Sequence, residues 1–126
     1  MLLDTHVLIW AVAEPARLSD VLRDEIVASH NQVSVSTATV WEIAIKRAQG
    51  RMGFPVERFE ATMRDMGYDI LPILPAHAIV AGALPRHHDD PFDRMLIAQS
   101  RCEGLTLVSD DAAIARYDVP LLRAAK

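Results

Sequence analysis

The chain has 126 residues, of which 51% are hydrophobic and 24% are charged, and it carries a net charge of −4 and a single cysteine. This length is that of one ordinary domain, and the hydrophobic fraction suffices for one continuous core, which excludes an intrinsically disordered chain. The lone Cys102 cannot form an internal disulfide, so we expect it to be a small core residue in a reducing compartment. The negative charge argues against nucleic-acid binding by bulk electrostatics, but it does not exclude a nuclease.

The apolar runs of the sequence are short. The longest of them, Val7–Ala13, is far below the ~20 residues that a membrane-spanning helix needs. The residues after Met1 also lack the basic segment with which a secretory signal begins. We therefore expect a cytoplasmic protein with no membrane segment.

Apolar periodicity in the first part of the chain predicts strands that alternate with helices. In chain order we expect a strand at Met1–Leu3, a helix at Val7–Val12, a helix from Ser19 to about His30, a turn at Asn31–Gln32, a strand at Val33–Val35 and a helix at Ala38–Gln49. Ser19 is a favourable N-cap, and Gly50 is a favourable helix end. In the Ser19 helix, Leu22, Ile26 and Val27 form the apolar positions.

The alternation continues in the second part of the chain. There we expect a helix from Pro55 to Gly67, an edge strand at Asp69–Leu74, a helix at Ala76–Leu84, a helix from Asp90-Pro91 to Glu103, a strand at Leu105–Val108, a short helix at Ala112–Arg116 and a strand at Val119–Leu122. Phe59, Met63 and Met66 share one helical face and are expected in the core. Pro72 places its strand at the edge of a sheet, because proline cannot donate to a strand ladder.

Strands separated by helices predict a parallel sheet with right-handed crossovers. The expected fold is therefore a three-layer α/β domain with about four or five parallel strands, formed as a single domain by residues 1–126. Sites in such folds lie beyond the carboxyl ends of the strands. The residues that follow each strand are therefore the first candidates for function.

Acidic residues occupy these positions. Asp4 follows the first strand, and Asp111 follows the strand that ends near Ser109. Glu42 lies in the first two turns of the helix after the second strand, and Asp93 lies in the first turn of the helix that Asp90-Pro91 opens. The topology predicts that these four carboxylates converge at one edge of the sheet.

Asp4 and Glu42 also have structural interpretations. Asp4 is a suitable N-cap for the first helix. Glu42 is placed to complete a capping box with Thr39, or to pair with Lys46 four residues later on the same helix.

The later acids have structural interpretations too. Asp90 is in the N-cap position before Pro91, and we assign it that role alone. Asp93 favours the positive end of its helix, and Asp111 is placed to cap the short helix at Ala112. Each role is more common than catalysis for a single acid, but four acids at strand ends together favour a functional site.

Clustered carboxylates repel one another and need a counter-ion. Lys46 and Arg94 are local candidates, yet an all-oxygen cluster suits Mg²⁺ or Mn²⁺. Zinc fits poorly, because His87 and His88 are adjacent rather than at a ligand spacing, and we expect them in a polar loop near the site. Nucleotide-binding glycine motifs and the G-x-S-x-G elbow are absent from the sequence, so metal-assisted phosphodiester hydrolysis is the favoured chemistry.

These residues resemble PIN-domain ribonucleases, specifically the VapC toxins of prokaryotic toxin–antitoxin pairs. The resemblance covers nearly the whole chain and rests on Leu2-Leu3-Asp4-Thr5-His6 with Trp10, on Trp41–Lys46, on His88–Arg94 running into Leu96–Gln99, and on Leu107–Asp111. It implies that Asp4, Glu42, Asp93 and Asp111 are catalytic and bind the metal, and that Thr5 supplies a hydroxyl beside the first acid. The family's last block reads Ser or Thr, any residue, then Asp, which points from Ser109 to Asp111 and leaves Asp110 as the ambiguous neighbour.

The resemblance further implies a Mg²⁺-dependent endoribonuclease, commonly a homodimer, that cuts structured RNA such as transfer or ribosomal RNA. A cognate antitoxin protein is expected to inhibit it by placing a cationic side chain at the acids and an apolar segment along exposed parts of helices Val7–Val12 and Ala38–Gln49. Two alternatives are a non-catalytic PIN-fold RNA-binding or scaffold module and a receiver-like signalling domain. A receiver-like domain needs a Lys at its strand ends, whereas Lys46 and Lys126 lie in mid-helix and at the terminus.

Overall fold

The computed structural model describes residues 1–28 and 32–125, and its centre is a parallel sheet. The strands are β1 (Leu2–Leu3), β2 (Ser34–Ser36), β3 (Asp69–Leu71), β4 (Leu107–Val108) and β5 (Leu121–Leu122). They follow the spatial order β3-β2-β1-β4-β5, and each neighbouring pair in the sheet is parallel. The predicted α/β class and parallel sheet are therefore confirmed, and β3 is an edge strand as Pro72 indicated.

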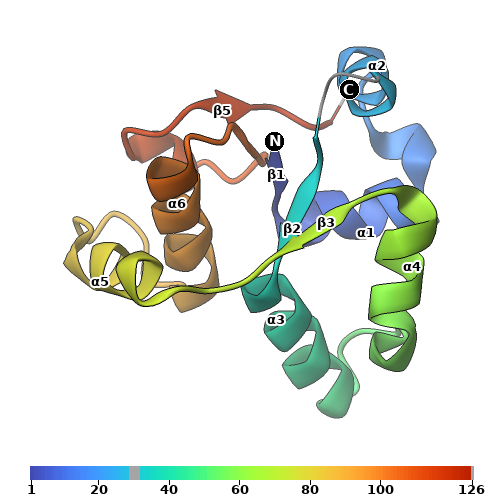
Figure 1. Ribbon diagram of the computed structural model, residues 1–126, viewed down its shortest axis with the longest axis horizontal. Helices are drawn as coiled ribbons and strands as arrows, with labels where there is room; N and C mark the ends of the chain where they lie inside the picture. The colour runs from blue at the N-terminus through green and yellow to red at the C-terminus, as the bar shows by residue number, and fades with distance from the viewer. Residues whose placement is uncertain (29–31, 126) are drawn as a thin grey trace.

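Helices cover both faces of this sheet (Figure 1). They are α1 (Thr5–Ala13), α2 (Asp20–Val27), α3 (Thr37–Ala48), α4 (Phe59–Met66), α5 (Pro75–Ala83) and α6 (Pro91–Glu103), with short 3₁₀ helices at Pro15–Arg17, Val56–Arg58 and Ile114–Arg116. In Figure 1, α5 and α6 lie side by side on one side of the strands, and α1 and α4 lie on the other. Within the described residues, no helix has both the length and the apolar character needed to cross a bilayer.

Two hydrophobic clusters fill the spaces between the layers. Because side chains alternate along a strand, the fully buried neighbours Leu2 and Leu3 enter different clusters. Leu3 packs with residues of α1, α2, α3 and α4, whereas Leu2 packs with Leu96 and Ile97 of α6. Burial of one such side chain contributes roughly 1.5–3 kcal/mol. β1 is therefore anchored from both faces, and this fixes the position of the residue that follows it.

Several helix ends confirm the signals in the sequence. The Ser19 hydroxyl accepts a hydrogen bond from the Leu22 N–H at 3.1 Å, and α2 begins at the next residue. Gly104 follows α6 with φ of 66°, a left-handed conformation that glycine adopts without a Cβ clash. Gly67 closes α4 in the same way, with φ of 76°.

Element boundaries differ from the prediction by a few residues. The strands are shorter than expected: β3 stops before Pro72, β4 begins at Leu107 and β5 at Leu121. The expected helix at Ala112–Arg116 is a 3₁₀ turn over its last three residues, and α2 ends at Val27. The expectations for His30 and for the first residue of the Asn31–Gln32 turn fall outside the described residues.

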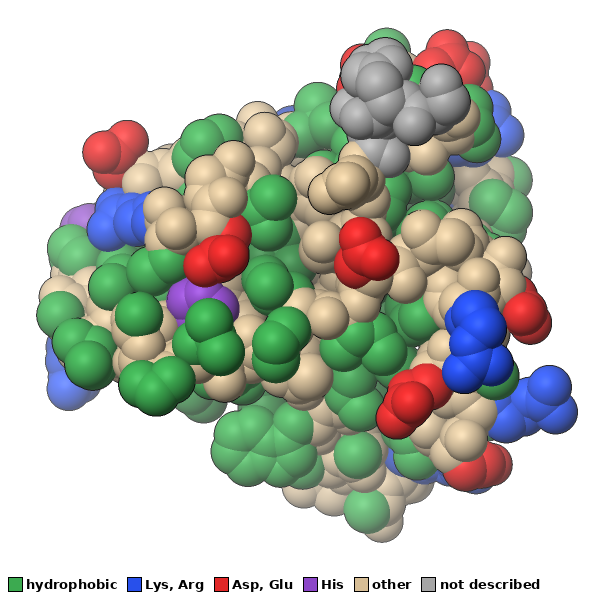
Figure 2. Space-filling model, in the orientation of Figure 1, with side chains coloured by type: hydrophobic (Ala, Val, Ile, Leu, Met, Phe, Trp, Pro, Cys, Tyr) green, Lys and Arg blue, Asp and Glu red, His purple; other side chains and the backbone are tan. Residues whose placement is uncertain are grey.

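Three residues expected to be apolar contacts face outward instead. Cys102 is exposed on the last turn of α6, so its assignment to the core was wrong. Met66 and Val27 are 38% and 78% exposed, because each lies in the last turn of its helix. Charged side chains of both signs gather over α4 in Figure 2, which fits a helix that buries only Phe59 and Met63.

Candidate active site

A cavity of about 330 Å³ lies beyond the carboxyl ends of β1, β2 and β4. Its lining contains Asp4, Thr5, His6, Val7, Trp10, Glu42, Lys46, His88, Asp90, Asp93, Asp110 and Asp111. The structure therefore brings together the four acids that sequence reasoning selected. Asp90, to which only a capping role was assigned, lines the same cavity.

Asp4 occupies the turn between β1 and α1. Its N–H donates to the Val108 carbonyl of β4, and its Oδ1 accepts the Val7 N–H at 2.9 Å. The predicted N-cap is thus present, and it aims a carboxylate that is only 7% exposed at the cavity. Burial raises the pKa of Asp4, and hydrogen bonds from Ser109 and Val7 oppose this rise without cancelling it.

Glu42 is buried in the second turn of α3, and two groups hold its carboxylate. The Thr5 hydroxyl donates to Oε1 at 2.5 Å, and the Lys46 ammonium contacts Oε2 at 2.7 Å. The Lys46 pairing is confirmed, whereas the capping box with Thr39 is not formed, because Ser36 is the N-cap of α3. The hydroxyl beside the first acid therefore positions the second acid.

Asp93 lies at the start of α6, beside Asp90 and His88. The Asp90 side chain caps α6 through the Phe92 and Asp93 N–H groups, as predicted. Burial, followed by the negative charge of Asp90, raises the pKa of Asp93 to about 7, although the contact with His88 opposes this. A carboxylate with this pKa is only partly ionised near neutral pH, which is the electrostatic signature of a crowded acidic site.

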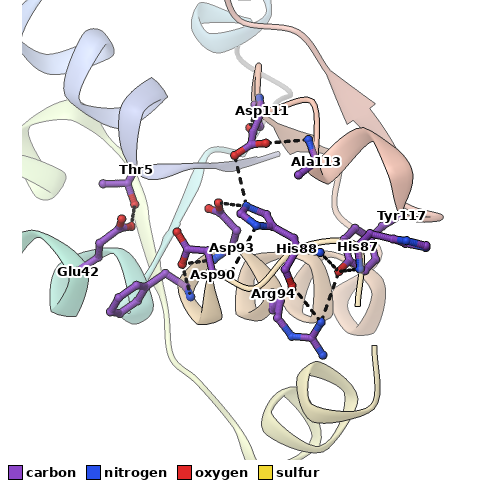
Figure 3. A network of polar contacts seen from close by, with 12 residues as sticks. Thr5, Glu42, His87, His88, Asp90, Asp93, Arg94, Asp111, Ala113 and Tyr117 are labelled. Carbon is purple, nitrogen blue, oxygen red and sulfur yellow. Dashed lines mark hydrogen bonds and ion pairs between the residues drawn. The ribbon is translucent and has the colours of Figure 1, made fainter. Parts of the chain in front are cut away.

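His88 stands between two of the acids (Figure 3). Its Nε2 lies 2.8 Å from Asp93 Oδ2 and 3.4 Å from Asp111 Oδ2. Burial lowers the pKa of His88, but the Asp93 hydrogen bond and the surrounding carboxylates reverse this, so the net pKa is raised. Sequence reasoning placed His88 in a nearby polar loop and missed that it contacts the acids directly.

Asp110 and Asp111 have different surroundings. Asp110 accepts hydrogen bonds from the Ala124 and Ala125 N–H groups at 2.8 and 2.9 Å and from Arg123 at 3.0 Å, which together lower its pKa despite partial burial. Asp111 uses Oδ1 to accept the Ala113 N–H at 2.8 Å, and Oδ2 faces His88. Asp110 thus fastens the C-terminal segment, whereas Asp111 joins the group around His88.

Arg94 is not the counter-ion that the sequence suggested. Its guanidinium donates to the carbonyl oxygens of Ala81, Leu84, Pro85 and His88 and to the Tyr117 hydroxyl. Lys46 does contact an acid of the cavity, but its charge is taken up by Glu42. The remaining carboxylates therefore favour an added cation.

The donor set suits a hard divalent cation. Asp4, Glu42, Asp93 and Asp111 offer carboxylate oxygens from four segments of the chain, the ligands that Mg²⁺ and Mn²⁺ prefer. Ligand atoms of His88, Asp90 and Asp93 also lie within 4.8 Å of one another. The raised pKa values of Asp4 and Asp93 mark carboxylates whose charge a bound cation would stabilise.

A protein family and a known relative both match nearly the whole chain. The PIN domain family matches residues 1–120. Ribonuclease VapC22 of Mycobacterium tuberculosis (strain ATCC 25618 / H37Rv) is 30% identical over 127 residues, covering 95% of this chain and 93% of the relative.

Solved structures share the fold. VapBC2 from Rickettsia felis, bound to a DNA fragment from its promoter, aligns with a TM-score of 0.72 and 15% identity over 98% of this chain and 97% of that one. A toxin–antitoxin complex from Klebsiella pneumoniae aligns with a TM-score of 0.68 and 16% identity, covering 96% and 94% of the two chains.

Proposed function

The chain belongs to the PIN-domain family, and from this premise we propose that it is a divalent-metal-dependent endoribonuclease, the toxin of a toxin–antitoxin pair. The observation that carries the proposal is the cavity into which the turn after β1, helices α3 and α6, and the segment after β4 each place a carboxylate. Similarity to a VapC ribonuclease over nearly the full length supports the same activity. A receiver-like domain is set aside, because the family match covers residues 1–120.

We assign Asp4, Glu42, Asp93 and Asp111 as the residues that hold Mg²⁺, with Mn²⁺ as a substitute. When bound, such an ion would neutralise charge on a phosphodiester and lower the pKa of a water molecule, so that hydrolysis would be feasible near neutral pH. Asp111 is preferred to Asp110 because Asp110 is engaged by the N–H groups of the C-terminal segment. The chain contributes fixed carboxylate positions, which reduces the reorganisation needed in the reaction.

The surrounding residues have supporting roles in this mechanism. Thr5, on α1, donates a hydrogen bond to the Glu42 carboxylate. Lys46 lies on α3, the helix that carries Glu42, and balances part of the charge of this carboxylate. The Val7 N–H fixes the orientation of Asp4 at the start of α1. Among the described residues, Asp4, Asp93 and Asp111 have no ion pair with a Lys or Arg, so RNA phosphates would be repelled without a cation. Binding and cleavage should therefore both require metal.

Cleavage assays on purified protein test the proposal. Asp4→Asn and Asp93→Asn should abolish cleavage of structured RNA in Mg²⁺ or Mn²⁺ while leaving the circular dichroism spectrum unchanged. Asp65→Asn, at an exposed position of α4, is the matched control and should cleave like wild type. Sequencing RNA ends after expression of wild type and Asp4→Asn identifies whether transfer or ribosomal RNA is cut. Wild-type cleavage in excess chelator, or full activity of both site variants, contradicts the mechanism.

A protein that binds RNA without cleaving it would instead be a scaffold module. In that case wild type and Asp4→Asn would produce the same RNA ends in the presence of Mn²⁺. The intact set of four acids disfavours this outcome, since a scaffold has no need of a crowded acidic cavity.

We further propose that a small antitoxin protein inhibits the site. An apolar hollow of about 360 Å³ lies between α1, which lines it with Ile9 and Val12, and the segment after α3, which lines it with Met52 and Phe54. α1 also borders the acidic cavity through Val7 and Trp10. An apolar segment in this hollow would therefore lie along the same helix as a cationic side chain placed among the acids.

Co-purification with the product of the adjacent upstream reading frame tests this partner. The complex should cleave RNA more slowly and bind Mn²⁺ more weakly than the free protein. Val12→Glu should weaken the complex, whereas Val21→Glu, at an exposed site on α2, should not. A partner that binds without changing cleavage or Mn²⁺ affinity contradicts the inhibitory mode.

A homodimer is the assembly we propose. Trp41 is 62% exposed on α3 and packs edge-on against Phe92 of α6 at a centroid distance of 5.2 Å, so an aromatic pair lies at the surface between these two helices. Light scattering should give twice the mass of the chain for wild type and for Val21→Glu, and a monomer for Trp41→Glu. A wild-type monomer at micromolar concentration contradicts the proposal.

A further inference from the structure

The loop between α5 and α6 brings His88 to the acidic cavity, and Tyr117 fastens this loop. Tyr117 follows the 3₁₀ turn Ile114–Arg116 and is only 6% exposed. Its hydroxyl donates to the Pro85 carbonyl at 2.6 Å and accepts the N–H groups of His87 and His88 at 3.1 and 3.0 Å. The Tyr117 hydroxyl thus binds the backbone of this loop at three residues.

Arg94 holds the same loop from α6. Its Nη1 donates to the Pro85 and His88 carbonyls at 3.0 and 3.3 Å and lies 3.4 Å from the Tyr117 oxygen. Its Nη2 donates to the carbonyls of Ala81 and Leu84 at the end of α5. A cation at a helix C-terminus is favourable, so this arrangement also stabilises the end of α5.

The loop leaves the His88 ring with one defined orientation. In the neutral ring, the Asp90 N–H that points to His88 Nδ1 at 3.4 Å makes Nδ1 the acceptor and leaves Nε2 as the N–H donor. Nε2 then donates to Asp93 Oδ2, with Asp111 Oδ2 also close by. His88 therefore links an acid of α6 to an acid of the segment after β4.

The loop that carries His88 and the segment from Asp111 to Tyr117 contact each other at two points. His88 contacts Asp111, and Tyr117, six residues after Asp111, binds the backbone of His88 (Figure 3). Asp111 is the most exposed of the four acids, with a side chain 39% accessible, and it lies outside regular secondary structure. It is thus the acid whose position depends most on its neighbours.

We propose that His88 is a positioning residue for Asp93 and Asp111, and that Tyr117, held by Arg94, keeps His88 between them. His88 Nε2 donates to Oδ2 of Asp93 and lies 3.4 Å from Oδ2 of Asp111, and these contacts would hold both carboxylates in place for a divalent cation. This inference rests on the proposed function, because it assigns these residues a role toward the metal. Hydrogen-bond partners of ligand carboxylates typically change metal affinity 10- to 100-fold when removed.

Metal binding provides the first test. Calorimetric titration with Mn²⁺ should give about tenfold weaker binding for His88→Ala than for wild type. His88→Gln should recover part of this affinity, because its amide retains an N–H donor. Tyr117→Phe, which removes one oxygen from a buried ring, should weaken binding in the same direction. Tyr68→Phe is the matched control, since Tyr68 is buried in the other hydrophobic cluster, and it should bind like wild type.

The double variant separates positioning from general destabilisation. If Tyr117 acts through His88, adding Tyr117→Phe to His88→Ala should cause no further loss of Mn²⁺ affinity. If Tyr117→Phe weakens Mn²⁺ binding by the same factor in wild type and in His88→Ala, Tyr117 acts independently of His88, which overturns the proposed link.

Nitrogen NMR of the metal-free protein tests the geometry without metal or RNA. At a pH above the pKa of His88, where the ring is neutral, wild type should show an unprotonated Nδ1 and a protonated Nε2. Tyr117→Phe should shift or broaden these resonances, while Tyr68→Phe leaves them unchanged. Unchanged His88 resonances in Tyr117→Phe overturn the positioning role. A wild type that binds no Mn²⁺ overturns the proposed function, whereas a wild type that binds and cleaves alongside an equally tight His88→Ala overturns this inference alone.

Discussion

Replacing Asp93 with Asn should stabilise the metal-free protein, and the gain should depend on pH. The pKa of Asp93 is raised from 3.8 to about 7, so between these values the folded protein retains a proton that the unfolded chain releases. The stability that this proton supplies is fully present below pH 3.8 and is lost as the pH rises through about 7. The rise in the pKa from 3.8 to about 7 corresponds to about 4 kcal/mol in the free energy of unfolding, at ~1.36 kcal/mol for each pKa unit.

Asn cannot ionise but keeps an oxygen that accepts the His88 N–H. In chelator at pH 8, Asp93→Asn should therefore have a free energy of unfolding above that of wild type by up to about 4 kcal/mol, and near pH 4 the two should be nearly equal. Burial causes most of the raised pKa, with Asp90 next and Asp4 a smaller contributor. Asp4→Asn should consequently reduce the gain only slightly.

Urea unfolding followed by circular dichroism at pH 4, 6 and 8 measures these differences. Asp65→Asn on the exposed face of α4 controls for the loss of one negative charge, and its difference from wild type should not vary with pH in this way. If the difference in unfolding free energy between wild type and Asp93→Asn is the same at all three pH values, Asp93 is not the crowded, partly buried carboxylate that we describe.

Three further results are expected. Mn²⁺ at a hundredfold excess over Kd should raise the free energy of unfolding of wild type by about 2.7 kcal/mol, and no rise in a thermal or urea titration would exclude a cation site. Asp111→Asn should abolish RNA cleavage with little change in stability. Asp110→Asn should retain cleavage, and its free energy of unfolding should fall by about 1–3 kcal/mol because its hydrogen bonds to the C-terminal segment are weakened. If only the Asp110 variant loses cleavage, our assignment of the two acids is reversed. Thr5→Val should cost about 1.5–3 kcal/mol and weaken Mn²⁺ binding, because it removes the donor to the buried Glu42, and an unchanged urea midpoint and affinity would show that this contact is inert.

The acids could be found from sequence because local signals place them. Asp4 and Asp111 follow apolar strands, and parallel strands end at one edge of the sheet, so chain order alone predicts that they approach. Glu42 and Asp93 lie in the first two turns of helices that the sequence predicts, and Asp90-Pro91 marks the start of the second. Alternation of strands and helices likewise sufficed for the fold class.

The supporting contacts could not be found in this way. Tyr117 binds residues 29 and 30 positions earlier, and Arg94 binds carbonyls whose positions depend on how α5 packs on α6. Apolar spacing also fails at helix ends: Cys102 and Met66 continue the pattern of their helices beyond the point where another layer covers them. The exposed state of these residues follows from tertiary packing rather than from periodicity.

Because Asp4 is both the helix cap of α1 and a candidate metal ligand, mutations at this position differ in whether they leave the protein folded. A cell that carried such a toxin without its antitoxin would favour inactive alleles. An Asn allele would lose the carboxylate yet still cap α1, because Asn is as good an N-cap as Asp. Ala or Val alleles would lose the cap as well, at a cost of about 1 kcal/mol or more. Surviving alleles that encode Asn at this position would therefore leave a folded protein that could still occupy the antitoxin, while alleles without a cap would tend toward degradation.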